Sequence, residues 1–248
     1  MNRIMIVTGA SRGIGAATAL LAAQRGYAVC VNYLRNRAAA EDVVRGIEGV
    51  GRRAIAVAAD VAVEDDVLRM FETVDRQLGR LTALVNNAGI LERQTTIAGI
   101  DSARLQRVFA TNVTGPFLCA REAVKRMSTR HGGEGGGIVN VSSRASQLGS
   151  PGEYIDYAAS KGAVESLTVG LAREVAEEGI RVNAVRPGFI YTEMHASGGE
   201  PGRVDRVKAF VPMKRGGTAG EVAGAILWLL SDESAYVTGT FIDVSGGR

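Results

Sequence analysis

Short apolar runs alternate with longer segments of helical periodicity along the whole chain. The runs lie at residues 3–8, 28–32, 54–58, 83–86, 137–141, 181–185 and 240–244, and helical patterns fill 14–25, 37–49, 63–77, 101–130, 153–178 and 218–230. The runs are almost continuously apolar, which is typical of strands that helices cover on both faces. The alternation predicts an α/β fold with a doubly wound, seven-stranded parallel sheet and right-handed crossovers.

Residues typical of helix ends support this order. Gly26 and Gly179 follow the first and fifth helical patterns, where a left-handed residue commonly ends a helix. Thr218, with Glu221 three residues later, fits a capping box at the start of the last helix. No Pro/Ser-rich linker or internal repeat divides the chain, so residues 1–248 are expected to form a single domain.

Composition argues against several classes of protein. The 248 residues are 46% hydrophobic and 22% charged with a net charge of +3, and no basic block suggests a nucleic-acid partner. The longest apolar stretches, such as 225–230, are far shorter than the roughly 20 residues of a membrane span, and no signal peptide precedes the first strand. We therefore expect a cytoplasmic protein with no membrane segment. Cys30 and Cys119 are expected to be reduced core thiols, and His131 and His195 lack a second ligand at metal spacing, so no metal site is expected.

The turn after the first predicted strand is rich in glycine. Residues 8–15 read TGASRGIG and lead directly into a helical pattern. Glycines let a chain turn sharply and bring backbone N–H groups close to a pyrophosphate, whose charge is favoured at a helix N-terminus. The spacing G-x-x-x-G-x-G differs from the usual G-x-G-x-x-G, and glycines also serve ordinary turns. Its place between the first strand and the first helix nevertheless predicts a dinucleotide-binding turn.

The end of the second predicted strand bears on which nucleotide binds. An NAD-preferring site usually has an acid there that holds the ribose 2′-hydroxyl, whereas this chain has Asn32. Arg12 in the turn and Arg35 just past the strand could both face a 2′-phosphate, because a guanidinium matches phosphate geometry. Either arginine could instead be a solvated surface residue. We expect NADP(H).

Further motifs follow in order along the chain. They are NNAG at 86–89, YAASK at 157–161, PG at 187–188 and DVSGG at 243–247. Together with residues 8–15, they resemble the short-chain dehydrogenase/reductase family over essentially the whole chain. The resemblance implies a Rossmann fold and reversible hydride transfer between NADP(H) and a carbonyl or secondary alcohol. The overall pattern most resembles 3-oxoacyl-(acyl-carrier-protein) reductases and the related glucose-type sugar dehydrogenases.

Tyr157 and Lys161 are four residues apart, which puts them on one face of a helix. A tyrosine that exchanges protons near neutral pH needs its pKa of about 10 lowered, and a nearby ammonium favours the phenolate. Taken alone, such a pair would more often be a packed tyrosine and a surface lysine. By the resemblance, Tyr157 is the general acid/base, Lys161 lowers its pKa and holds the nicotinamide ribose, and Asn112 supports a water that relays protons from Lys161. Tyr154 is no substitute, because Ala158 is four residues after it.

The resemblance also implies a serine that hydrogen-bonds the substrate oxygen. By the resemblance this serine is Ser143, at the end of the strand 137–141. The adjacent Ser142 would face the other side of a continuing strand, so only one of them can point at the substrate. Ser143 and Tyr157 are 14 residues apart, one more than is common in the family. This difference indicates a small insertion in the loop 147–153.

The remaining cofactor contacts carry over by resemblance. Asp60 and Val61 resemble adenine contacts, although Asp60 could instead be the acid at the start of a helix. The segments after the fourth and sixth strands are expected to run beside the cofactor and flank the nicotinamide, while Asn87 ties strands together. The full set of expected cofactor-binding residues is Gly9, Ser11, Arg12, Gly13, Ile14, Gly15, Asn32, Arg35, Asp60, Val61, Asn86, Ala88, Gly89, Tyr157, Lys161, Pro187, Gly188, Ile190 and Thr192.

Two segments are expected to set the substrate, the loop 189–206 and the stretch 145–153. Neither contains a basic cluster dedicated to a phosphate or carboxylate, and the glycine-rich loop is expected to form a mobile lid because it has few apolar residues. A 3-oxoacyl thioester ranks slightly ahead of a sugar. A non-catalytic NADP-binding redox sensor is disfavoured, because Asn112, Ser143 and the Tyr157–Lys161 pair are all kept.

The helical pattern 153–178 contains small residues that permit close approach of another helix. In the family this helix and the pattern 101–130 pair between subunits, so the resemblance implies a homotetramer. The alternative is that the small residues pack on the chain's own sheet. These residues are Ala159, Gly162, Ala163, Ser166 and Gly170.

Overall fold

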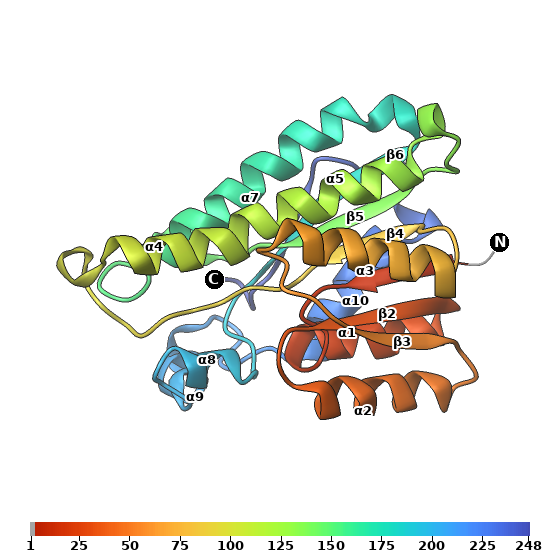
Figure 1. Cartoon of the computed structure of the whole chain (residues 1–248). Helices are drawn as coiled ribbons and strands as arrows, with labels where there is room; N and C mark the ends of the chain where they lie inside the picture. Colours follow the sequence, from red (N-terminus) through yellow and green to blue (C-terminus); the bar gives the residue numbers. More distant parts are fainter. Residues whose placement is uncertain (1–2) are drawn as a thin grey trace.

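Seven parallel strands form one sheet in the computed structural model, which describes residues 3–248. Their order across the sheet is β3-β2-β1-β4-β5-β6-β7 (Figure 1). The bounds are β1 Arg3–Val7, β2 Tyr27–Tyr33, β3 Ala54–Ala58, β4 Ala83–Asn86, β5 Gly136–Val141, β6 Ile180–Pro187 and β7 Phe241–Val244. The predicted seven-stranded parallel sheet is confirmed, and the observed strand ends lie within two residues of the predicted ones.

Helices cover both faces of this sheet, as predicted (Figure 1). One face carries α1 (Gly13–Gln24), α2 (Arg37–Glu48) and α10 (Ala219–Leu229), and the other carries α3 (Glu64–Gln77), α5 (Gly115–Met127) and α7 (Ile155–Glu174). The helix α4 (Ser102–Phe109) precedes α5 and contacts α7. Three short helices, α6 (Ala145–Leu148), α8 (Met194–Ser197) and α9 (Arg203–Val207), fall within the segments predicted to set the substrate.

Strands β1 to β6 each contribute to two apolar cores, because successive side chains of a strand point to opposite faces. Met5 of β1 is fully buried in the core beneath α1, α2 and α10, and Ile6 is fully buried in the core beneath α3 and α5. Cys30 of β2 and Cys119 of α5 are both buried in the second core as free thiols. The prediction that both cysteines are reduced core residues is confirmed.

The predicted helix 101–130 is not a regular α-helix throughout. A π turn over Ala110–Thr114 separates α4 from α5, which ends at Met127. Pro116 explains the interruption, because it has no N–H to donate to the carbonyl four residues before it. The predicted helical stretch is therefore present over 102–127, and its π-helical centre, which was not predicted, carries Asn112.

The predicted helix ends agree better with the structure. Gly26 and Gly179 both adopt left-handed backbone, with φ of +94° and +75°. Thr218 and Glu221 form the predicted capping box of α10. Within residues 3–248, no helix combines the length and apolar character needed to cross a bilayer.

The strand order reverses between β1 and β4, which lie side by side in the sheet. The chain continues from β1 outward through β2 and β3, then returns to build β4 on the other side of β1. Open parallel sheets bind ligands outside the carboxyl ends of the strands at such a reversal. The loops after β1 and β4 are joined there, because the Thr8 hydroxyl accepts hydrogen bonds from the backbone N–H groups of Asn87 and Ala88, both at 2.9 Å.

Candidate active site

The glycine turn between β1 and α1 has no room for side chains. Gly9 and Gly13 have φ of +60° and +56°, in the left-handed region that favours glycine. A Cβ on Gly15 would lie 2.5 Å from Asn87 Nδ2 and 2.6 Å from the Gly9 carbonyl oxygen. The first turn of α1 also contains no acidic residue. A close, uncharged backbone surface at a helix N-terminus fits the pyrophosphate of a dinucleotide.

Asn32 fixes this turn with its side-chain amide. Its Oδ1 accepts from the Gly9 N–H at 3.1 Å, and its Nδ2 donates to the carbonyl oxygens of Val57 (3.3 Å) and Ala59 (3.0 Å). The side chain is buried and leaves no carboxylate at the end of β2. Arg12 and Arg35 are both exposed, so their guanidinium groups are accessible to a 2′-phosphate.

Two of the residues predicted to contact adenine have other partners in the structure. Asp60 Oδ1 accepts from the Ala62 N–H at 2.9 Å and forms an Asx turn in the loop before α3, so Asp60 is not the residue that caps this helix. The side chain of Val61 is buried, and a Cβ on Gly115 would lie 2.8 Å from its Cγ2. Both side chains therefore shape the loop after β3.

The side chains of Asn86 and Asn87 join different parts of the fold. Asn86 is buried and donates to Asn140 Oδ1 at 2.9 Å and to the Pro116 carbonyl at 3.3 Å, so its side chain joins β4 to β5 and α5. Asn87 donates to the Thr8 carbonyl at 2.8 Å, as predicted for a residue that ties strands together. Asn87 also lines the cavity described next, which the sequence prediction missed.

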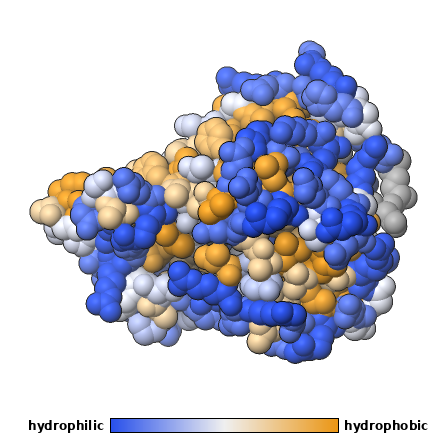
Figure 2. All heavy atoms as spheres, in the orientation of Figure 1, coloured by the Kyte–Doolittle hydropathy of each residue, from blue (hydrophilic) through white to orange (hydrophobic). Residues whose placement is uncertain are grey.

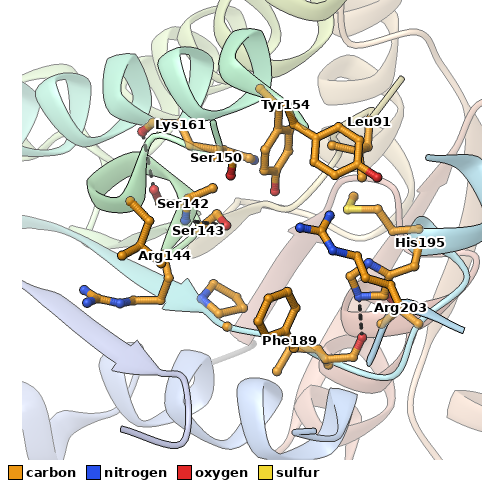
Figure 3. Close-up of a pocket in the computed structure, with 18 of the residues that line it drawn as sticks. Leu91, Ser142, Ser143, Arg144, Ser150, Tyr154, Lys161, Phe189, His195 and Arg203 are labelled. Carbon is orange, nitrogen blue, oxygen red and sulfur yellow. Dashed lines mark hydrogen bonds between the residues drawn. The ribbon is translucent and has the colours of Figure 1, made fainter. Parts of the chain in front are cut away.

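A cavity of about 490 Å³ opens near the carboxyl ends of β4, β5 and β6. The loops around α6 and α8–α9 form the rest of its wall (Figure 3). Several predicted site residues share this cavity, namely Ile14, Ser143, Tyr157, Lys161, Pro187, Gly188, Ile190 and Thr192. Thr192 also lies over the glycine turn, since a Cβ on Gly13 would be 3.4 Å from its Cγ2. The structure thus joins Ser143, Tyr157 and Lys161 with the predicted nicotinamide-flanking residues in one space, whereas Asn112 does not line it.

Tyr157 and Ser143 face the same part of this cavity. Burial raises the pKa of Tyr157 above its ordinary value, while the Ser143 hydroxyl and the positive charge of Arg203 oppose this rise. Lys161 Nζ donates to the Val141 carbonyl at 2.8 Å and lies 5.5 Å from the centre of the Tyr157 ring. Burial of the phenol opposes the lowering expected from Lys161, and the effect of Lys161 on the pKa of Tyr157 stays a prediction.

Lys161 is itself deeply buried. Burial lowers the pKa of its ammonium group to about 8, because the charged form loses its hydration. Asn112 lies close by, since a Cβ on Gly89 would be 3.4 Å from Asn112 Oδ1 and 3.5 Å from Lys161 Nζ. The Asn112 amide holds the loop after β4 by accepting from the Ile90 N–H at 2.8 Å and donating to the Ile90 carbonyl at 3.0 Å.

The two neighbouring serines point to different partners. Ser142 is buried and donates to Glu165 at 2.9 Å, whereas Ser143 is half-buried and accepts from the Ala145 N–H at 3.1 Å. The Ser146 hydroxyl lies within hydrogen-bond distance of both the Glu165 carboxylate and the Ser143 carbonyl oxygen (2.7 Å), so its single proton is shared between these two acceptors. The arrangement favours Ser143 as the serine available to a substrate, with a polar network fixing its backbone.

The far wall of the cavity is built around Arg203 of α9. Its guanidinium lies over the rings of Tyr154 (4.7 Å) and Phe189 (5.4 Å) and pairs with Glu153. The arginine is only 7% exposed, so these three residues hold it in one position. Arg248 contributes a second guanidinium, 4.5 Å from the Phe189 ring.

His195 of α8 lies beside Arg203 (Figure 3), close enough for the arginine's charge to act on it. Its Nε2 is 3.1 Å from the Ile190 carbonyl oxygen, and its Nδ1 is buried without a hydrogen-bond partner in the part of the chain described. Burial, followed by the charge of Arg203, lowers the pKa of His195, so the imidazole is neutral at pH 7. No group of three or more metal-ligating side chains occurs within residues 3–248.

Comparison with known proteins agrees with this arrangement. The family model described as enoyl-(acyl carrier protein) reductase matches residues 9–248. The oxidoreductase YgfF of Escherichia coli is 63% identical over 245 residues, which are 99% of each chain. The chain belongs to the short-chain dehydrogenase/reductase family. A 3-oxoacyl-[acyl-carrier-protein] reductase of Synechocystis sp. is 41% identical over 246 residues, 99% of this chain and 96% of the relative.

Solved structures of short-chain dehydrogenases/reductases are similar over the same length. A family member from Mycobacterium marinum superimposes with a TM-score of 0.92 at 35% identity, covering 99% of this chain and 94% of the other. The acetoin dehydrogenase YohF of Salmonella typhimurium gives a TM-score of 0.88 at 33% identity, covering 100% and 97%. This chain is accordingly an oxidoreductase of a pyridine-nucleotide-dependent family that acts on CH–OH/C=O groups.

The far wall of this short-chain dehydrogenase/reductase was not predicted residue by residue. Glu153 and Arg203 lie in the two segments expected to set the substrate, but nothing in either segment alone indicates their pairing. The only available signal was that an acidic residue in one segment and a basic residue in the other could form an ion pair. The loop is also anchored more firmly than its composition indicated, because Val204 and Val207 are buried. Mobility of this loop stays a prediction.

Proposed function

We propose that this chain transfers a hydride between NADP(H) and a carbonyl or secondary alcohol. The observation that supports this proposal best is the position of Ser143, Tyr157 and Lys161 around one cavity. Pro187 and Gly188, expected beside the nicotinamide, line the same cavity. The reacting oxygen and the cofactor ring would therefore meet in a single space.

Bound NADP(H) supplies or accepts the hydride, and the protein manages the substrate oxygen and its proton. Ser143 and Tyr157 donate hydrogen bonds that polarise a carbonyl oxygen, and Tyr157 gives this oxygen its phenolic proton as the alcohol forms. In the reverse direction the phenolate takes the proton back.

The cofactor preference is proposed on the exposed Arg12 and Arg35 and the absence of an acid at Asn32. Each Arg→Ala substitution is expected to weaken NADPH binding about 10-fold, because a charge-assisted contact to the 2′-phosphate is lost, and to change NADH binding little. Arg25→Ala, at an exposed residue beyond the far end of α1, serves as the control. Equal binding of NADH and NADPH by the unmodified protein would refute the preference.

Two substrate classes deserve direct comparison. A 3-oxoacyl thioester is proposed first, from the similarity to the Synechocystis reductase. A sugar-type hydroxylated substrate is the second candidate, favoured by polar residues that line the cavity, such as Ser150 and Glu153. The experiment is NADPH and NADH consumption by the pure protein against 3-oxoacyl thioesters, sugars, ketones and quinones, with Tyr157→Phe measured alongside.

The outcomes separate the alternatives. NADPH-dependent turnover that Tyr157→Phe abolishes while retaining NADPH binding supports the proposed chemistry. Tight NADPH binding without turnover of any compound would favour the non-catalytic redox sensor instead. A protein that binds neither nucleotide would contradict the proposal altogether.

We also propose a cytoplasmic homotetramer with α7 in a subunit interface. Gly162 and Gly170 have no described atom outside the neighbouring turns of α7 within 4 Å of an added Cβ, so the face of α7 that carries them is not covered by the chain's own sheet. The opposite face packs on the sheet through Val164 and Thr168. Leu105 of α4 and Phe117 of α5 are 41% and 50% exposed. Hydrophobic atoms also reach the surface near the end of the molecule where α4 begins (Figure 2). Sedimentation of a monomer would contradict this assembly.

A further inference from the structure

Four side chains of alternating charge form a row beside the cavity. They are Glu165 of α7, Arg186 of β6, Asp243 of β7 and Arg144 of the loop after β5. Arg186 joins the two carboxylates, because its guanidinium binds both oxygens of Glu165 and its Nη1 lies 3.6 Å from Asp243 Oδ1. The other oxygen of Asp243 accepts from Arg144 Nη1 at 2.9 Å. The row thus connects four separate segments of the chain.

The guanidinium of Arg186 is held in one position. The side chain is only 14% exposed, and its Cζ lies 4.1 Å from the centre of the Phe241 ring. Arg186 and Asp243 are also direct neighbours in the register of β6 and β7. A planar guanidinium that stacks on a ring and binds a carboxylate with two donors has little freedom to move. Arg186 therefore fixes where its two carboxylate partners lie.

One of these partners belongs to the helix that carries the predicted general acid/base. Glu165 follows Lys161 by four residues and Tyr157 by eight, so the three lie along one face of α7. Arg186 does not line the cavity, and neither does Glu165. Arg186 can therefore influence the reaction only through the residues that it holds.

The loop that carries Ser143 is attached to the charged row on both flanks. Ser142 donates to Glu165 at 2.9 Å on one side of Ser143, and Arg144 pairs with Asp243 on the other. Both attachments end on carboxylates that Arg186 brings together. The position of this loop relative to α7 therefore depends on one guanidinium.

We propose that Arg186 is a positioning residue that sets the Ser143 hydroxyl at its working distance from Tyr157. The inference rests on the proposed carbonyl reduction, in which these two hydroxyls bind the same oxygen. Loss of Arg186 would free both flanks of the serine loop, and a displacement of about 1 Å can lower a rate about 100-fold. The alternative is that the row only stabilises the edge of the sheet.

The test compares the same substitution with and without the serine hydroxyl. With the best substrate of the panel above, Arg186→Met is expected to lower kcat about 10- to 100-fold, while the Kd for NADPH stays constant. In a Ser143→Ala background it should lower kcat less than about 2-fold, because the hydroxyl that Arg186 positions is already absent. A purely stabilising role predicts equal losses in both backgrounds.

A conservative variant and a matched arginine complete the comparison. Arg186→Lys, measured in both backgrounds, should lose only about 3-fold with Ser143 present, because an ammonium pairs with Glu165 without the second donor. It carries the test if Arg186→Met does not fold. Arg181→Met is the control, because Arg181 lies at the other end of β6 and donates to the Leu229 carbonyl at 2.7 Å. It should lower the melting temperature and leave kcat unchanged.

Hydrogen exchange examines the loop without any turnover. The amide protons of residues 143–148 are expected to exchange about 10-fold faster in Arg186→Met than in the unmodified protein, because the loop opens locally more often. The amide protons of β1 should exchange at the same rate in both proteins. The measurement requires only the folded chain and its bound NADPH.

The possible failures are distinguishable. Wild-type kcat in Arg186→Met, or equal losses of kcat with and without Ser143, would overturn the positioning role and leave the carbonyl reduction standing. Absence of turnover by the unmodified protein with every compound would refute the proposed function instead. The exchange of residues 143–148 then decides on Arg186 by itself, and an unchanged rate would overturn its role.

Discussion

Glu165 of α7 receives the guanidinium of Arg186 on both carboxylate oxygens, with Nε and Nη2 each 2.8 Å away. The same carboxylate accepts from Ser142 and Ser146, which lie on either side of Ser143 in the sequence. Although burial alone would raise the pKa of Glu165, the hydrogen bonds from these three partners lower it below its ordinary value. The ionised Glu165 therefore holds Ser142 and Ser146 in the loop after β5, on the side of the loop that α7 covers.

Removing this charge should displace the Ser143 hydroxyl without changing the affinity for the nucleotide. Glu165→Gln is expected to lower kcat about 10- to 100-fold, because small displacements of a positioned hydroxyl are costly, while the Kd for NADPH stays constant. Glu174→Gln, at an exposed residue of the same helix, is the matched control. Unaltered kcat in Glu165→Gln would show that Ser143 is held by other contacts.

A second buried ion pair should matter for stability. Arg104 and Asp156 are 7% and 3% exposed, with Nε–Oδ2 and Nη2–Oδ1 distances of 2.6 and 3.0 Å. Arg104→Ala is expected to lower the free energy of unfolding by about 3–5 kcal/mol, because Asp156 is left buried and unpaired. Denaturant titration measures this loss. The double variant Arg104→Met/Asp156→Leu should lose less, and a larger loss would contradict the explanation.

The buried Lys161 predicts a dependence of stability on pH. Its pKa falls from 10.5 to about 8 on folding, so between these values the unfolded chain binds more protons and wild-type stability rises with pH. Lys161→Met removes this contribution. The difference in unfolding free energy between Lys161→Met and wild type should fall by about 3 kcal/mol from pH 7.5 to pH 10.5. A difference that is flat across this range would mean that the ammonium is well solvated.

The glycine turn predicts opposite effects for two Gly→Ala substitutions. Gly15→Ala places a Cβ 2.5 Å from Asn87 Nδ2, so it should cost about 1–3 kcal/mol of stability and weaken nucleotide binding. Gly224→Ala in α10 meets no described atom within 4 Å and should gain about 1 kcal/mol from helix propensity. Thermal unfolding and fluorescence titration with NADPH measure both. Stabilisation by Gly15→Ala would contradict the close packing at the turn.

The sheet could be predicted because both faces of each strand are buried, which leaves a continuous apolar run in the sequence. The π turn between α4 and α5 could not be predicted in the same way, because both helices keep an apolar periodicity. Only Pro116 signals the π turn. Helical periodicity is a property of a window of residues. A single extra residue between two such windows changes the geometry but hardly changes the pattern.

The candidate site shows the same division. Tyr157 and Lys161 share one helix, so their relation follows from spacing alone. Glu153 and Arg203 are 50 residues apart, and their pairing depends on how two loops meet above the sheet. The sequence also could not predict how burial acts on the pKa of Tyr157. Desolvation depends on all the neighbours of the phenol and not only on the lysine four residues away.

The π turn at Ala110–Thr114 limits how this protein can be made more heat-resistant. Deleting one of its residues would restore a regular α-helix and its hydrogen bonds, but it would rotate the flanking faces by about 100° relative to each other. Asn112 would then leave the loop after β4 and the neighbourhood of Lys161. A deletion that makes this helix more rigid is therefore expected to lower the activity of the enzyme. Thermostabilisation should therefore begin at helices remote from the cavity.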